Sequence, residues 1–145
     1  MRVVLQRVGH AAVDVDGATV GAIGPGLLAL VGVGHGSTPG DARWLAAKTA
    51  DLRVFADADG RMNLSVRDIG GAVLAVSQFT LYGDVARGRR PSFGAAALPE
   101  QARKLYELYC SAVPVVVERG VFGAHMTITA EADGPVTLLL EREGS

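Results

Sequence analysis

The sequence predicts an α+β fold in which a mainly antiparallel, barrel-like β-sheet carries two packed helices, and it predicts a single domain over residues 1–145. Hydrophobic residues make up 49% of the chain and charged residues 20%, which is typical of a folded domain with a buried core. About eight segments have the apolar pattern of strands and are separated by turn residues. The two helical segments follow groups of strands, which favours helices that cover one face of a sheet.

The first third of the chain predicts a β-meander. Residues 2–8 and 10–15 alternate between apolar and other side chains, as half-buried strands do. Asp16-Gly17 is a strong hairpin signal, and residues 18–23 are predicted to form the returning strand. Residues 27–33 are continuously apolar, which predicts a strand covered on both faces.

Two helices are predicted in the rest of the chain. The first begins at Thr38, which is followed by a proline and an acidic residue, and its apolar residues recur at helical spacing. The second begins at Pro99, and an apolar stripe runs from Ala102 through Leu105 to Ala112. Each helix therefore has one face suited to packing on the sheet.

The remaining strands are short, except for a long apolar strand at residues 72–81. Short strands are predicted at residues 52–55, 62–66, 115–118, 122–130 and 136–140. Asp133-Gly134 is expected to turn the last two of these into a hairpin. Residues 82–95 contain several glycines, arginines and a proline, so they predict a loop.

Charge, cysteine content and hydropathy exclude several classes of protein. The 14 basic and 15 acidic residues leave a net charge of −1, which argues against a chain that coats nucleic acid but allows a local basic patch. Cys110 is the only cysteine, so neither an internal disulfide nor a cysteine zinc site is expected. The three histidines lie on separate predicted elements, so no metal or other cofactor is expected. No apolar run approaches the ~20 residues of a membrane-spanning helix, and we expect a soluble, cytoplasmic protein.

A glycine-rich segment, Gly32-Val33-Gly34-His35-Gly36, overlaps the end of the apolar strand at 27–33. It resembles a phosphate-binding glycine loop, but it lacks the G-x-G-x-x-G order, and no acidic residue is placed to bind a ribose. A flexible connection between a strand and a helix is the favoured interpretation.

Polar side chains interrupt the end of the strand predicted at 72–81. This end has the sequence Ser77-Gln78-Phe79-Thr80-Leu81 and directly precedes the loop. A buried polar group without a partner costs about 1–3 kcal/mol, so the Ser, Gln and Thr side chains need hydrogen-bond partners. Either the strand lies at a sheet edge with its polar side in water, or the strand end forms a binding site.

Two other segments place unusual chemistry beside predicted strands. Arg87, Arg89 and Arg90 are clustered in the loop, where they form either a solvated charge run or a contact surface for phosphates. Gly134-Pro135 precedes the last strand. A trans peptide bond is the ordinary expectation there, because only ~5–6% of X-Pro bonds in folded proteins are cis.

Together these motifs resemble the D-aminoacyl-tRNA deacylase family, from Met1-Arg2-Val3-Val4-Leu5-Gln6-Arg7-Val8 almost to Glu141. Ser77-Gln78-Phe79-Thr80-Leu81 is similar to the first signature of that family, and Gly88-Arg89-Arg90-Pro91-Ser92-Phe93 to the loop that follows it. Gly134-Pro135-Val136-Thr137 matches most of the second signature.

One departure from the family pattern falls in the second signature. The signature usually opens with Asn two residues before the glycine, and Ala132 occupies that position here. An Asn side chain there can brace the turn, and the neighbouring Asp133 is the residue that can substitute for it.

The resemblance implies an editing hydrolase that releases free amino acid and tRNA and spares L-aminoacyl-tRNA. Its substrate is a tRNA 3′ end that carries a D-amino acid, or glycine mischarged on tRNA(Ala). The resemblance also implies a homodimer in which Gly134-Pro135, joined by a cis bond, reaches into the partner's site near Ser77 to Thr80. Arg7 is a candidate brace for this segment, and Arg87, Arg89 and Arg90 are candidates for tRNA binding.

The chemistry of such a site can be worked out from the ester substrate. Negative charge develops on the carbonyl oxygen and needs fixed donors, for which the Phe79 N–H is our candidate. If the α-ammonium is held by the carbonyls of Gly134 and Pro135, a D side chain points to solvent and an L side chain collides with that backbone. Glycine has no side chain and passes the same test.

The nucleophile expected is an oriented water molecule, assisted by the 2′-OH of the terminal ribose as the resemblance suggests. Thr80 has no evident base in the sequence, and a hydroxyl without a base is a poor nucleophile. Ser77 and Gln78 would position the adenosine end and the ester. Two rivals remain: an RNA-end binding module without catalysis, and an esterase that pairs Ser77 or Thr80 with a histidine.

Overall fold

A long first strand organises the main sheet. The computed structural model describes residues 1–145, and β1 (Arg2–Val15) pairs antiparallel with β8 (Thr127–Glu141) along most of its length. On its opposite edge, β1 pairs antiparallel with β3 (Gly26–Gly32) along its first half and with β2 (Ala18–Ile23) along its second half. β1 is one continuous strand, where the sequence analysis divided it into two.

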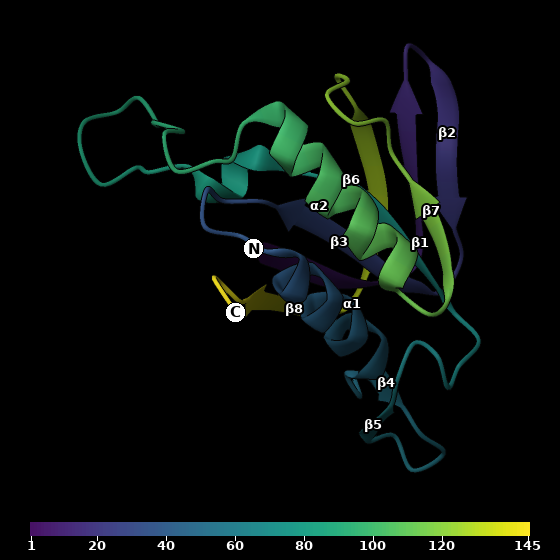
Figure 1. The fold of residues 1–145 in the computed structure, drawn as a ribbon. Helices are drawn as coiled ribbons and strands as arrows, with labels where there is room; N and C mark the ends of the chain where they lie inside the picture. Colours follow the sequence, from purple (N-terminus) through teal and green to yellow (C-terminus); the bar gives the residue numbers. More distant parts are fainter.

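The other half of the sheet is parallel. β3 pairs with β6 (Ala72–Ser77), and β6 pairs with β7 (Val116–Arg119), both in parallel. Parallel neighbours need a crossover connection, and these crossovers contain α1 (Pro39–Asp51) and α2 (Pro99–Ala112). Both helices lie on one face of the sheet (Figure 1), so the predicted α+β class with two packed helices is confirmed.

The main sheet curls until its two edges approach each other. At the edges, Gly21 of β2 lies against the backbone of Arg119 of β7, and a Cβ atom at Gly21 would lie 2.6 Å from the Arg119 carbonyl oxygen. A glycine at this position therefore allows the two strands to approach. The result is the nearly closed, barrel-like sheet that the sequence predicts.

Two apolar clusters fill the two faces of the sheet. Alternate residues of β3 face opposite ways: Leu27 and Val31 belong to the cluster under the helices, and Leu28 belongs to the cluster on the other face. The strand is therefore covered on both sides, as its continuous apolar run predicts. The helices are joined at their contact by a hydrogen bond of 2.8 Å between the hydroxyls of Thr49 and Tyr109.

Two of the predicted turn and cap signals are confirmed. Asp16 and Gly17 both have positive φ, at 51° and 79°, as a tight hairpin turn requires. Thr38 caps α1: its hydroxyl accepts a hydrogen bond from the Asp41 N–H, and the Asp41 carboxylate accepts one from the Thr38 N–H.

The strand predicted at 72–81 is wrong in its second half. β6 ends at Ser77, and a short 3₁₀ helix, η1 (Phe79–Tyr82), follows it. The Gln78 N–H still donates to the Val31 carbonyl of β3, but the Leu81 N–H donates to the Gln78 carbonyl. Local turn hydrogen bonds thus replace the sheet pairing that the apolar run 79–82 suggested.

The hairpin predicted at Asp133-Gly134 is also wrong. One strand, β8, runs through these residues, and its pairing with β1 slips in register on either side of Val8. The shift in register accommodates Asp133 and Gly134, and β8 remains paired with β1 on both sides of them. Residues 122–126, predicted as strand, belong to the connection before β8.

The strand predicted at 52–55 is nearly absent. Leu52 instead ends α1, where its N–H donates to the Lys48 carbonyl. Only β4 (Phe55–Ala56) is extended, and it pairs with β5 (Met62–Leu64) in a separate two-stranded sheet. Neither α1 nor α2 is long and apolar enough to cross a membrane.

Asp41 ties the C-terminal segment to the start of α1. Its buried carboxylate accepts hydrogen bonds from the backbone N–H groups of Thr38, Gly144 and Ser145 and from the Ser145 hydroxyl, at 2.6–3.1 Å. Burial raises the pKa of Asp41, but the hydrogen bonds from Ser145 and from the other donors lower it more, so the pKa lies well below its usual range.

We predict that this carboxylate contributes to acid unfolding. Because the folded-state pKa is lowered, the contribution is complete above the unfolded-state pKa of about 3.9 and is lost as pH falls below it. Asp41→Asn should be less stable than the wild type at pH 7 but should lose less unfolding free energy between pH 5 and pH 3. Urea unfolding at each pH measures this, and equal losses in the two proteins would contradict it.

Candidate functional site

The end of β6 opens on a cleft of about 640 Å³ with mostly apolar walls. Three segments that are distant in sequence form it: the end of β6 with the start of η1, the segment that leads into α2, and the connection before β8. The lining residues include Ser77, Gln78, Phe79, Phe93, Leu98, Phe122, His125 and Met126. The volume lies within the range of small-ligand pockets, ~300–1,000 Å³.

The backbone at the cleft offers hydrogen-bond donors. Phe79 and Thr80 are the first two residues of η1, and the first N–H groups of a helix have no acceptor inside it. The Gln78 side chain does not cap this turn. The Phe79 N–H therefore lies at the end of β6, beside the polar side chains that the sequence analysis singled out.

Aromatic side chains border the same donors. The rings of Phe79 and Phe93 meet edge to face, with centroids 5.1 Å apart and planes at 70°. Phe79 remains 56% exposed and Leu98 70% exposed, which is high for large apolar side chains in a folded chain. The cleft therefore presents apolar and aromatic surface next to backbone N–H groups.

Thr80 has no base beside it. Its hydroxyl has one hydrogen-bond partner, the side-chain amide of Gln78, and an amide cannot take up a proton at neutral pH. Two histidines are engaged elsewhere: His10 contacts Glu131 at 3.3 Å, and His35 contacts the Gly94 carbonyl at 2.7 Å. His125 lines the cleft, but it makes no hydrogen bond with Ser77 or Thr80. The arrangement required by the serine or threonine esterase alternative is therefore not formed.

The three clustered arginines lie on a loop that extends away from the body of the molecule between η1 and α2 (Figure 1). Arg87, Arg89 and Arg90 are all exposed, and none forms an ion pair. At the base of the loop, Asp84 and Ser92 exchange backbone hydrogen bonds of 2.7 and 3.0 Å. The loop thus holds unpaired positive charge next to the segment that lines the cleft.

Gly134-Pro135 lies on a different surface. It is exposed in the middle of β8, its peptide bond is cis as the resemblance implies, and it does not line the cleft of its own chain. Arg7 holds this segment: its Nε lies 3.2 Å from the Asp133 carbonyl and 3.3 Å from the Asp133 carboxylate, and its Nη1 donates to the Val54 carbonyl at 2.6 Å.

Apart from the arginines of the exposed loop, the structure brings the predicted site residues together in two groups. Ser77, Gln78 and Phe79 line the cleft, with Thr80 next to them in η1, whereas Arg7 and Gly134-Pro135 lie apart from it. Ala132 stands where the family usually has Asn, and its side chain cannot hydrogen-bond to the turn. The neighbouring Asp133 makes the contacts with Arg7 instead. The structure contains no cluster of three His, Cys, Asp or Glu side chains that could hold a metal ion.

The apolar wall of the cleft consists of residues that the sequence did not single out. Phe93, Leu98, Phe122 and Met126 come from loops or their borders, where an apolar residue has no periodicity to mark its role. The available signal was weak: Phe93 lies in the segment predicted as a loop, whereas Phe122 and Met126 fall in the strand predicted at 122–130. That signal does not distinguish a cleft wall from an ordinary core contact.

Comparison with known proteins identifies a family whose members are similar in sequence to this chain. A family model described as D-Tyr-tRNA(Tyr) deacylase matches residues 4–141. A D-aminoacyl-tRNA deacylase of Halalkalibacterium halodurans is 56% identical over 144 residues, which cover 97% of this chain and 99% of that protein. A protein of the same name from Thermomicrobium roseum is 55% identical over 144 residues, covering 97% and 94% of the two chains.

Solved structures have the same fold. The c-Myc DNA unwinding element binding protein superimposes with a TM-score of 0.92 at 37% identity, over 98% of this chain and 99% of its own. A probable eukaryotic D-amino acid tRNA deacylase superimposes with a TM-score of 0.79 over 96% and 97% of the two chains, and at 19% identity it supports the fold alone. The match over nearly the whole sequence shows that this chain belongs to the D-aminoacyl-tRNA deacylase family of hydrolases.

Proposed function

We propose that this protein hydrolyses the ester bond of D-aminoacyl-tRNA in the cleft at the end of β6, and that it spares L-aminoacyl-tRNA. The observation that carries the proposal is the cleft itself, where the uncapped N–H groups of η1 lie beside apolar walls and no nucleophile has a base. Such a site stabilises charge on a bound ester but does not form a covalent intermediate.

The terminal adenosine of tRNA suits the cleft. Single-stranded RNA ends are bound by stacking their bases on aromatic side chains, and Phe79 and Phe93 present such rings. Ser77 and Gln78 offer a hydroxyl and an amide to the ribose and the ester. The arginines of the adjacent loop can contact the tRNA phosphates.

The reaction needs a water nucleophile. Water attacks the ester carbonyl, and the Phe79 N–H stabilises the oxyanion of the tetrahedral intermediate. The intermediate then expels the 3′-oxygen of the tRNA, which takes up the proton that the attacking water has lost. The products are free amino acid and tRNA. Thr80 has no base and is not proposed as the nucleophile. As the family resemblance suggests, we propose that the neighbouring 2′-OH of the terminal ribose orients the water.

A second copy of the chain is proposed to complete the site. β8 is paired on one edge only, and Leu138 and Leu139 are exposed on it near Val4 and Leu81. An unpaired edge with an apolar surface favours association with another copy. In the homodimer, Gly134-Pro135 of each chain would enter the partner's cleft near Ser77 to Thr80.

Chirality would be tested by this inserted backbone. With the ester carbonyl on the η1 donors and the α-ammonium on the carbonyls of Gly134 and Pro135, the two remaining directions at the α-carbon differ. A D side chain points to solvent, and an L side chain meets the inserted backbone. Glycine escapes the exclusion, so glycyl-tRNA mischarged on tRNA(Ala) is a further proposed substrate.

We place the enzyme, as one domain of residues 1–145, in the cytoplasm, where aminoacyl-tRNA is used.

The proposed function is tested with matched D- and L-aminoacyl-tRNA and with glycyl-tRNA. Rapid hydrolysis of the D and glycyl esters with a stable L ester is expected. Equal rates on both enantiomers would contradict the proposal, and binding without hydrolysis would favour an RNA-end binding module. A terminal 2′-deoxyadenosine should lower kcat if the 2′-OH assists the water.

Thr80→Ala tests the nucleophile. We expect kcat to stay within about tenfold of the wild type, because the reaction does not use the hydroxyl as an attacking group. Single-turnover assays on D-aminoacyl-tRNA measure this. An acyl group trapped on Thr80, or a loss on the order of 10⁴-fold with an intact fold, would establish covalent catalysis instead.

Replacing Arg87, Arg89 and Arg90 by Ala tests the binding of tRNA phosphates. KM should rise with little change in kcat, and the slope of log(kcat/KM) against log[salt] should become shallower by roughly 0.7–0.9 for each phosphate that is no longer bound. Arg61→Ala, an exposed arginine in the turn next to β5, is the matched control and should leave the slope unchanged. A change in kcat alone at saturating substrate would argue against the binding role.

Gly134→Ala tests the inserted backbone. Gly134 has φ +117°, and a Cβ atom there would lie 3.0 Å from Arg7 Nη2 and from the Val136 backbone N. Activity on D-aminoacyl-tRNA should fall at least tenfold, on the order of 1.4 kcal/mol in the barrier. Gly60→Ala also introduces a Cβ at positive φ but meets open space, so it controls for backbone cost and should retain activity. Equal activity of the two variants would remove Gly134 from the site.

A further inference from the structure

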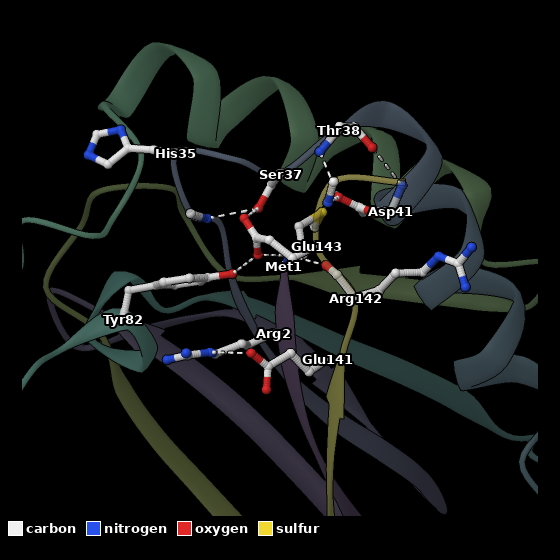
Figure 2. Close-up of polar contacts among 12 residues, drawn as sticks. Met1, Arg2, His35, Ser37, Thr38, Asp41, Tyr82, Glu141, Arg142 and Glu143 are labelled. Carbon is white, nitrogen blue, oxygen red and sulfur yellow. Dashed lines mark hydrogen bonds and ion pairs between the residues drawn. The ribbon is translucent and has the colours of Figure 1, made fainter.

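A chain of polar contacts outside the cleft connects the end of η1 to the C-terminal segment. The hydroxyl of Tyr82, the last residue of η1, donates to Glu143 Oε2 at 2.7 Å. The same oxygen lies 2.8 Å from the α-ammonium of Met1, and Glu143 Oε1 accepts a hydrogen bond of 3.3 Å from the Ser37 hydroxyl. Figure 2 shows these side chains converging on the Glu143 carboxylate.

Arg2 holds the same turn from another direction. Its Nη1 donates to the Leu81 carbonyl of η1 at 2.8 Å, and its guanidinium lies over the Tyr82 ring, 4.5 Å from the centroid. Its Nε also pairs with Glu141 at 3.2 Å (Figure 2). The last two residues of η1 are thus fixed through the Leu81 carbonyl, the Tyr82 ring and the Tyr82 hydroxyl.

The glycine-rich segment before α1 provides the backbone surface under these contacts. A Cβ atom at Gly34 would lie 2.5 Å from the Tyr82 ring, and one at Gly32 would lie 3.0 Å from the Leu81 Cβ. One at Gly36 would lie 3.1 Å from Glu143 Oε1. The segment that resembles a phosphate-binding loop therefore packs closely against η1 and Glu143.

The protonation states fix the direction of the Tyr82 hydrogen bond. Burial raises the pKa of the Tyr82 hydroxyl, and the Glu143 hydrogen bond raises it further, so the hydroxyl keeps its proton at neutral pH. Burial also raises the pKa of Glu143, but contacts with the Met1 ammonium, Tyr82 and Ser37 lower it more, and the net pKa lies below its usual value. The result is a charge-assisted hydrogen bond to an ionised carboxylate.

We propose that Tyr82 and Glu143 are positioning residues for the deacylation reaction, which hold η1 so that the Phe79 N–H points at the oxyanion. Neither residue lines the cleft, so neither touches the substrate. Tyr82 and Phe79 are the two ends of one short 3₁₀ turn, and a shift of Tyr82 therefore moves the Phe79 amide. A misplacement of about 1 Å in a reacting geometry can cost ~10²-fold in rate. This inference rests on the proposed function.

Tyr82→Phe and Glu143→Gln test the inference. The first variant keeps the ring under Arg2 and removes only the hydroxyl, and the second keeps the side-chain shape and removes the charge. Tyr109→Phe is the matched control, because it removes a buried hydroxyl that bonds Thr49 between the two helices. All three variants should lose stability to a similar degree.

The kinetic readout separates positioning from stability. With D-aminoacyl-tRNA, Tyr82→Phe and Glu143→Gln should lower kcat about tenfold, less than the ~10²–10³-fold loss on removing an oxyanion donor outright, and KM should stay within about twofold. Tyr109→Phe should retain the wild-type kcat. Wild-type kcat in both Tyr82→Phe and Glu143→Gln, or an equal loss in Tyr109→Phe, would overturn the inference.

Amide hydrogen exchange provides a readout that needs no substrate. Exchange of the peptide covering residues 78–83 should be faster in Tyr82→Phe and Glu143→Gln than in the wild type, and unchanged in Tyr109→Phe. Unchanged exchange in the first two variants would overturn the inference even if the wild type is an active deacylase. A wild type without D-selective hydrolysis would instead defeat the proposed function, and the exchange result would still decide whether these residues hold the turn.

Discussion

The candidate site depends on the position at which β6 ends and the chain leaves the main sheet. β6 pairs with β3 up to Ser77, and the next N–H, that of Gln78, still donates to the Val31 carbonyl. One residue later the backbone turns into η1, and its N–H groups are free for another acceptor. A strand that continued to Leu81 would use these donors in sheet pairing and would leave none for an ester oxygen.

Side chains and backbone have different roles in the cleft. The cleft walls are mainly apolar, and the polar groups best placed for charge are amides of the main chain. Amides have no protonation equilibrium near neutral pH, so the proposed oxyanion donors would remain competent across the physiological range. The proposed selection by an inserted backbone would not depend on the identity of the D side chain, which would suit a hydrolase that acts on many amino acids.

Features of the fold that depend on interactions between residues close in sequence were predictable, and features that depend on distant residues were not. The helix at Thr38, the hairpin at Asp16-Gly17 and the apolar strand β3 were predictable, because capping, turn chemistry and burial act within a few residues. The end of β6 and the continuity of β8 were not. Both depend on partners distant in sequence: the glycines beside η1, and β1 along β8. Polar residues after an apolar run marked the site but did not show that the strand had ended.

β1 also connects the two separated parts of the site. Arg2 holds η1 through the Leu81 carbonyl, and Arg7 holds the Gly134 segment through Asp133. The two arginines are five positions apart, which is about 17 Å along an extended strand. Because a paired central strand is stiff, it holds the Gly134 segment apart from the cleft of its own chain. The proposed site uses both groups and would therefore need two chains. In each chain, β1 would set the distance between the Gly134 segment and the cleft.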